Sequence, residues 1–98
     1  MQVDQPKITV DWDAVDWDRV DEAALAIMLL ALHDGWRTWK GIDWEVLNRL
    51  HDKGLITDPK SKAKSVIFTE EGLEESQRIF AMLFGRNTAT EQHREDPL

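Results

Sequence analysis

The spacing of apolar and polar residues along the chain predicts three helices. The first covers residues 19–33, and residues 23–32 within it form an unbroken apolar run. Because such a run leaves no polar face, this helix must be buried on most of its circumference or shared with a second subunit. A second helix is predicted over residues 43–53, and a third follows Thr69. Their apolar faces are formed by Val46, Leu47 and Leu50 in the second helix and by Leu73, Ile79, Phe80, Leu83 and Phe84 in the third.

Polar residues that cap helices stand where each of these patterns begins. Asp16 or Asp18 precedes the first helix, Asp43 the second and Thr69 the third. A side-chain oxygen at such a position accepts a hydrogen bond from a free backbone N–H of the first turn. Glycines at positions 35, 54 and 85 follow the three patterns and predict where the helices end.

Two short apolar segments predict a β-hairpin. Residues 55–57 and 65–68 are expected to pair antiparallel, with a turn at Asp58-Pro59 and an exposed, mobile connection over residues 60–64. The alternation of Ile8, Val10 and Trp12 with polar residues also allows a short strand near the N-terminus. The pattern therefore predicts an α+β fold that is mostly helical, with three main helices and a two-stranded hairpin wing.

Polarity divides the chain into three parts. Residues 1–17 are expected to form a partly ordered leader, and residues 18–85 a winged-helix-like domain. Residues 86–98 are polar and have no apolar period, which predicts a disordered tail.

One stretch resembles the passage from recognition helix to wing in two repressor families, the multiple-antibiotic-resistance type and the phenolic-acid type. It consists of Leu50-His51-Asp52-Lys53-Gly54-Leu55-Ile56 and Val66-Ile67-Phe68-Thr69-Glu70-Glu71-Gly72-Leu73. The resemblance implies a winged-helix fold, in which a positioning helix precedes the recognition helix. Here nine residues, 34–42, separate His33 from Asp43, which leaves room for a single turn around residues 36–40. The positioning helix is therefore expected to be truncated or absent.

Residues 20–84 as a whole resemble a family of short, uncharacterised bacterial proteins, a domain of unknown function. The resemblance is carried by Leu32-His33-Asp34-Gly35-Trp36-Arg37, Trp39-Lys40-Gly41-Ile42-Asp43-Trp44 and Lys62-Ala63-Lys64-Ser65-Val66. It implies no activity, because none is established for that family. The doubled Val-Asp-Trp-Asp unit ahead of the first helix looks like an addition to the family pattern.

Composition narrows the class of protein. The chain has no cysteine, which excludes disulfides and thiolate metal sites. Its longest apolar run falls well short of the roughly 20 residues that cross a bilayer, and no signal peptide is visible. We therefore expect a cytoplasmic protein without membrane contact. The net charge is −7, yet residues 36–64 carry seven basic and four acidic residues. This basic middle is either a solvated face or an anion-facing patch.

No pattern of catalytic or metal-binding residues is present. The sequence has neither a nucleophile elbow nor a glycine-rich phosphate loop. Asp11, Asp13 and Glu22 fit three positions of a calcium loop, but Val15 and Asp16 occupy positions that need a ligand and a glycine. The three histidines lack the spacing of paired metal ligands. We expect no enzymatic activity, no cofactor and no metal.

The five tryptophans are many for a chain of this length. Trp36, Trp39 and Trp44 surround the short connection between the first two helices. They either fill the space of the missing positioning helix or form a contact surface, because Trp and Arg are common at interface hot spots. The candidate interaction surface is Trp36, Arg37, Trp39, Lys40 and Arg49. It favours a non-catalytic binding or regulatory module that acts through protein contacts, with an unknown protein or as a homodimer.

The alternative is a DNA-binding winged-helix transcriptional regulator. The candidate phosphate contacts are the wing residues Lys60, Lys62 and Lys64. Glu45 and Asp52 on the outer face of the second helix oppose contact with DNA. The isoelectric point of about 4.8 also lies far below the value above about 9 that is typical of nucleic-acid-binding domains. Any DNA affinity is therefore expected to be weak and independent of sequence.

Overall fold

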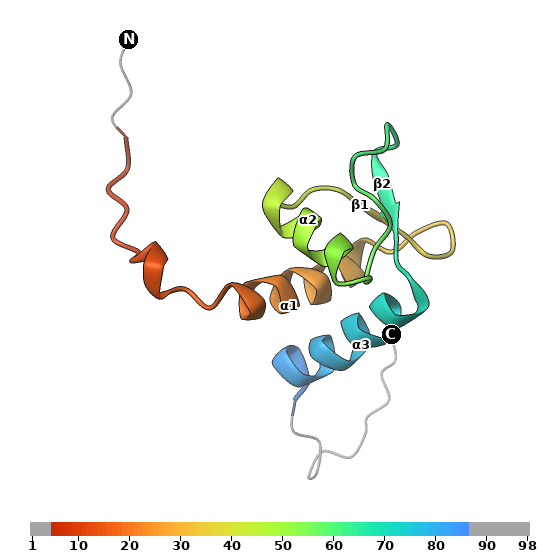
Figure 1. Cartoon of the computed structure of the whole chain (residues 1–98). Coiled ribbons are helices and arrows are strands. Elements are labelled where there is room, and N and C mark those ends of the chain that lie inside the picture. The colour runs from red at the N-terminus through yellow and green to blue at the C-terminus, as the bar shows by residue number, and fades with distance from the viewer. Residues whose placement is uncertain (1–4, 87–98) are drawn as a thin grey trace.

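The computed structural model describes residues 5–86, in which three α-helices pack beside a small antiparallel sheet (Figure 1). The helices are α1 (Trp17–Met28), α2 (Trp44–Asp52) and α3 (Glu70–Phe84), and the strands are β1 (Arg37–Trp39) and β2 (Ser65–Ile67). The 3-10 turns η1 (Trp12–Ala14) and η2 (Leu29–Ala31) lie on either side of α1. The mostly helical α+β class is confirmed. The predicted disordered tail lies, from residue 87 onward, outside the described residues.

Each helix begins at a side chain that the sequence predicts as its cap. The Asp16 carboxylate accepts from the backbone N–H of Arg19 at the start of α1, and Asp43 accepts from Glu45 at the start of α2. At α3 the Thr69 hydroxyl accepts from the N–H of Gly72 at 2.9 Å and donates to the Gly54 carbonyl at 2.7 Å. Each such cap contributes about 1 kcal/mol.

The first helix ends earlier than predicted, because the chain turns back on itself. The α-helix stops at Met28 and η2 extends it only to Ala31. Asp34 and Gly35 then adopt positive φ values of 45° and 84°, and a two-way backbone bridge joins His33 to Arg37. The Thr38 hydroxyl donates to the Met28 carbonyl at 2.7 Å and so ties this connection to the end of α1.

The connection between α1 and α2 is a strand, so the single turn predicted around residues 36–40 is wrong. β1 pairs antiparallel with β2, and Thr38 lies opposite Val66. The predicted pairing of residues 55–57 with 65–68 is confirmed in direction, but it is reduced to a bridge between Ile56 and Phe68. The Thr57 N–H donates to the Ile67 carbonyl at 2.9 Å. β2 therefore lies between β1 and the segment that contains Ile56.

The core forms where α1 contacts both α2 and α3 (Figure 1). The predicted inward stripe of α2, namely Val46, Leu47 and Leu50, is buried in it, together with Leu25, Ala26, Met28, Ile56, Val66, Phe68 and Ile79. One side of the first helix is left uncovered, since Ile27 exposes 42% and Leu30 exposes 70% of its surface. The apolar run thus exceeds what one copy of the described fold buries.

The N-terminal part runs away from the body as an extended arm over residues 5–11 (Figure 1). No strand forms at Ile8, Val10 or Trp12, and all three side chains are exposed. Among the described residues, no helix is both long and apolar enough to span a membrane.

Candidate interaction surfaces

The sheet turns one face to the core and the other to solvent. Because side chains alternate along a strand, Thr38 and Val66 face the core and are buried, whereas Arg37, Trp39 and Ile67 are exposed on the other face. Ser65, which pairs with Trp39, is the buried residue of that outer face. The ring of His33 stacks on that of Trp39, with centroids 3.9 Å apart. We use the name sheet surface for the exposed group Trp36, Arg37, Trp39 and Ile67 together with His33.

The tryptophans near the sheet do not fill the space of a missing helix, so that interpretation is wrong. Trp36, Trp39 and Trp44 expose 44%, 53% and 48% of their surfaces. This connection is instead formed by β1, and its middle residue Thr38, which exposes none of its surface, points toward the core. The aromatic contact surface is the interpretation that agrees with the exposure of these rings.

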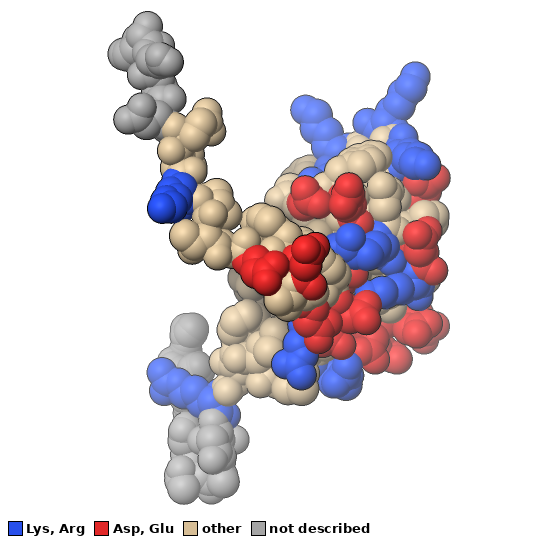
Figure 2. Space-filling view, turned by 60° about the vertical axis from the view of Figure 1, so that its left-hand side comes forward, with Lys and Arg blue, Asp and Glu red and all other residues tan. Residues whose placement is uncertain are grey.

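Lys40 and the basic loop form one unit. The Lys40 ammonium donates to the carbonyls of Pro59 at 2.7 Å and Ser61 at 2.8 Å, so this side chain holds the loop instead of projecting from the sheet surface. The wing residues Lys60, Lys62 and Lys64 are exposed. Basic side chains project at the upper end of the body in Figure 2, where Figure 1 places the loop before β2.

Arg49 lies in an ion-pair cluster between α1 and α2. Its guanidinium donates to both oxygens of Asp21, at 2.8 and 2.9 Å, and the Lys53 ammonium donates to the same carboxylate at 3.1 Å. The side chain of Asp21 is only 1% exposed, while those of Arg49 and Lys53 are 32% and 38% exposed. Arg49 therefore joins two helices, and the structure does not place it on the sheet surface.

The hydrogen bonds of this cluster favour the charged forms of its three side chains. Burial by itself raises the pKa of Asp21, but the hydrogen bonds from Arg49 and Lys53 outweigh it and hold that pKa below its ordinary value. The hydrogen bond to Asp21 raises the pKa of Arg49. Burial lowers the pKa of Lys53, and its hydrogen bonds to Asp21 and Asp18 more than compensate, so the net shift is upward.

Three tryptophans surround a groove between the N-terminal turn and the start of α2. The rings of Trp12 and Trp17 stack 6.0 Å apart at an interplanar angle of 15°, and the Arg49 guanidinium lies 5.3 Å from the Trp17 ring centre. The groove has a volume of about 800 Å³. We call it the aromatic groove, and it is lined by Trp12, Trp17, Val20, Asp43, Trp44, Glu45, Val46 and Arg49.

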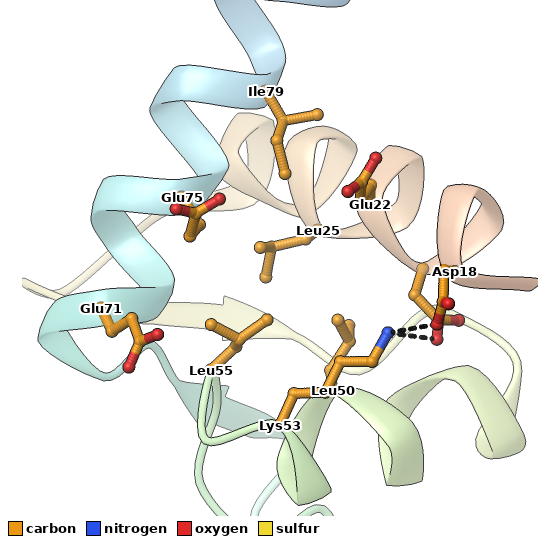
Figure 3. A pocket seen from close by; sticks show the side chains of 10 residues that line it. Asp18, Glu22, Leu25, Leu50, Lys53, Leu55, Glu71, Glu75 and Ile79 are labelled. Atoms are coloured by element: carbon orange, nitrogen blue, oxygen red, sulfur yellow. Dashed lines mark hydrogen bonds and ion pairs between the residues drawn. The ribbon is translucent and has the colours of Figure 1, made fainter.

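A second hollow, of about 410 Å³, lies where α1, α2 and α3 meet (Figure 3). Its floor is apolar, and Glu22 from α1 and Glu71 and Glu75 from α3 stand around it. The hydrogen bond from Arg78 lowers the pKa of Glu75. A general acid at neutral pH needs a raised carboxyl pKa, so the shift at Glu75 does not favour acid catalysis. Within residues 5–86, no cluster of three or more histidine, aspartate or glutamate side chains is placed to hold a metal ion.

Sequence reasoning missed the buried carboxylate and the aromatic groove. Asp21 looks like one more acid in an acidic segment, and its cationic partners are 28 and 32 residues away. The doubled Val-Asp-Trp-Asp unit was a signal for the groove, because it repeats a tryptophan five residues apart and so supplies both Trp12 and Trp17.

Comparison with known proteins agrees with the resemblance inferred from the sequence. The chain is 48% identical over 67 residues to the uncharacterized protein y4hR of Sinorhizobium fredii (strain NBRC 101917 / NGR234), which covers 68% of this chain and 90% of that protein. No solved structure matches the chain significantly. The model of a domain of unknown function, DUF6429, matches residues 16–86. The chain therefore belongs to the DUF6429 family.

Proposed function

We propose that the chain is a non-catalytic binding or regulatory module of the cytoplasm that acts through protein contacts. The observation that carries this proposal is the exposure of the tryptophans, each of which leaves between 40% and 56% of its surface in solvent. Tryptophan is highly buried on average, and it is the residue type most enriched at the energetic centres of protein interfaces. Five exposed indoles in one small domain are explained best by partners that cover them.

The sheet surface is the first contact region in this proposal. Its backbone is fixed by the pairing of β1 with β2 and by the bridge between His33 and Arg37. Stacking on His33 restricts the ring of Trp39. A surface that is ordered before binding loses less conformational entropy when a partner arrives, which favours affinity.

A homodimer belongs to the same proposal. The uncovered side of the first helix presents Ile27 and Leu30, and the end of α3 presents Met82, Leu83 and Phe84, all of them exposed. Burial of such side chains against a second copy is favourable at about 25 cal/mol per Å² of apolar area. Sharing with a second subunit is one of the two ways to cover the long apolar run of the first helix.

DNA binding through a winged helix is the second candidate. The order α1, β1, α2, β2, α3 with an exposed basic loop before β2 supports it. Among the ion pairs of the described residues, none involves Lys60, Lys62 or Lys64, so their charges are free for phosphate. Glu45 and Asp52 are exposed on α2 and oppose contact with a polyanion.

Site-specific photo-crosslinking tests the protein-contact proposal. The photoreactive residue p-benzoylphenylalanine replaces Trp36 or Trp39 in cells that naturally make the protein, and Glu74, exposed on α3, serves as the control position. We expect discrete adducts from the two sheet positions, identified by mass spectrometry, and none from the control. The same adducts from all three positions, or none from the sheet surface, would overturn the proposal.

A further inference from the structure

We propose that the aromatic groove binds a basic segment of a partner protein and seats an arginine or lysine side chain among its tryptophan rings. The inference rests on the proposed function and specifies the chemistry of one partner. The groove is open and large enough for a long side chain, with a volume of about 800 Å³. Trp12, Trp17 and Trp44 expose 56%, 40% and 48% of their surfaces around it.

The rings of the groove suit a cation. The face of an indole attracts a positive charge more strongly than that of any other side chain. One ring already does so within the molecule, because the Arg49 guanidinium lies 5.3 Å from the centre of Trp17. Arg49 does not repel a second cation strongly, since Asp21 compensates its charge through two hydrogen bonds.

The charges around the groove select the same class of ligand. Asp43 and Glu45 line it directly, and Asp11 and Asp13 flank Trp12 in the sequence. An acidic segment would be repelled by these carboxylates. A purely apolar segment would cover Asp43 and Glu45 without supplying a partner for them, which is costly.

The occupant is a different protein and not the basic loop of a second copy. Residues 60–64 of another copy are exposed and have the required charge. However, such a contact joins two different surfaces of identical chains, which leads to open assemblies unless the rotation closes.

Nuclear magnetic resonance on the full chain tests the assignment, because each indole N–H group gives its own signal. The signals of Trp12, Trp17 and Trp44 report on the aromatic groove, and those of Trp36 and Trp39 report on the sheet surface. The probe is a hexapeptide with two arginines and two lysines, and its control has glutamine at those four positions. We expect saturable shifts of the indole signals of Trp12, Trp17 and Trp44, no shifts at Trp36 and Trp39, and weaker binding as salt is raised. Equal shifts with the glutamine peptide, shifts confined to Trp36 and Trp39, or no saturable shift would overturn the proposal.

Variants separate ring and charge contributions. Trp44→Ala should weaken binding of the basic peptide roughly five-fold, and Trp44→Phe should restore most of it. Glu45→Gln should weaken binding about two- to three-fold, while the matched control Glu74→Gln, exposed on α3, should not. Equal effects of the two glutamate variants would contradict the charge argument. Crosslinks from Trp36 and Trp39 do not depend on the aromatic groove. Absence of peptide binding in the groove would therefore overturn this assignment without overturning the protein-contact function.

Discussion

Replacement of Asp21 by asparagine tests whether an ion pair holds α1 against α2. Asparagine keeps the shape of the side chain but removes its charge and turns an amide donor toward Arg49 or Lys53. The carboxylate is 1% exposed and accepts hydrogen bonds of 2.8, 2.9 and 3.1 Å from the two cations. Loss of one partner from a fully buried ion pair costs about 3–5 kcal/mol. Because Arg49 and Lys53 are partly exposed and regain water, we expect Asp21→Asn to lower the free energy of unfolding by about 2–3 kcal/mol.

The assay is unfolding by urea, followed through far-ultraviolet circular dichroism, with a thermal melt beside it. A loss of that size should lower the Tm by roughly 10–20 °C, since 1 kcal/mol corresponds to about 4–8 °C in a domain of 60–100 residues. The control is Asp52→Asn, which removes an exposed carboxylate from α2, the helix that carries Arg49. It should change the free energy of unfolding by less than about 0.5 kcal/mol.

The dependence on pH supplies the decisive comparison. The pKa of Asp21 is lowered in the folded state, so its stabilising contribution is fully present above the unfolded pKa of about 3.9. The contribution is lost as the pH falls through the lower, folded pKa. The difference between the native chain and Asp21→Asn should therefore be largest near neutral pH and shrink in strong acid. A difference below about 1 kcal/mol at pH 7, or one that stays constant into strong acid, would refute the ion-pair account.

Three further outcomes are expected. Gly72→Ala should destabilise the fold by roughly 2 kcal/mol in a thermal melt, because the added Cβ would lie 1.8 Å from the Leu55 carbonyl oxygen; a variant as stable as the native chain contradicts this. Light scattering should give about twice the chain mass of 11.4 kDa at high micromolar concentration, and Leu30→Glu should give the monomer mass, whereas a monomeric native chain counts against the dimer. Weak binding of duplex DNA should show a log–log salt slope near −3, and simultaneous replacement of Lys60, Lys62 and Lys64 by glutamine should abolish it; nanomolar affinity for one sequence would favour the DNA-binding candidate instead.

The features that the sequence predicted correctly are local ones. The caps at Asp43 and Thr69 act within three residues of their own position, and the stripe of Val46, Leu47 and Leu50 follows the period of one helix. The sequence pattern did not predict β1, because a strand of three residues is too short to show a repeated alternation of polar and apolar side chains. Its buried residue is also a polar threonine. Its burial depends on a hydrogen bond to Met28, ten residues earlier, which no local pattern contains.

The candidate site was predicted in part, and the errors have a common cause. Hydrophobicity alone favours burial of tryptophan. It therefore does not distinguish a ring that is buried in the core from an exposed ring that a partner covers. Charge has the same ambiguity, because Lys40 and Arg49 look like free surface cations until their partners are known. In the structure Lys40 is bound to two loop carbonyls and Arg49 to Asp21. Only Trp36, Arg37 and Trp39 of the expected surface lie together on the outer side of the sheet.

The family match covers one of the two proposed contact regions completely and the other only in part. It covers residues 16–86, which include the whole sheet surface and the basic loop, whereas Trp12 lies ahead of it. The sheet surface is therefore built from the matched domain alone, and the aromatic groove needs one ring from the segment before it. Trp12 stacks there on Trp17, and such aromatic pairs contribute about 0.5–1.5 kcal/mol beyond their buried area. A ligand that inserts between the two rings therefore breaks a contact of only this size. Under the two proposals, recognition through the sheet surface is a property of the matched domain, and the groove adds a selectivity that depends on the N-terminal segment of this chain.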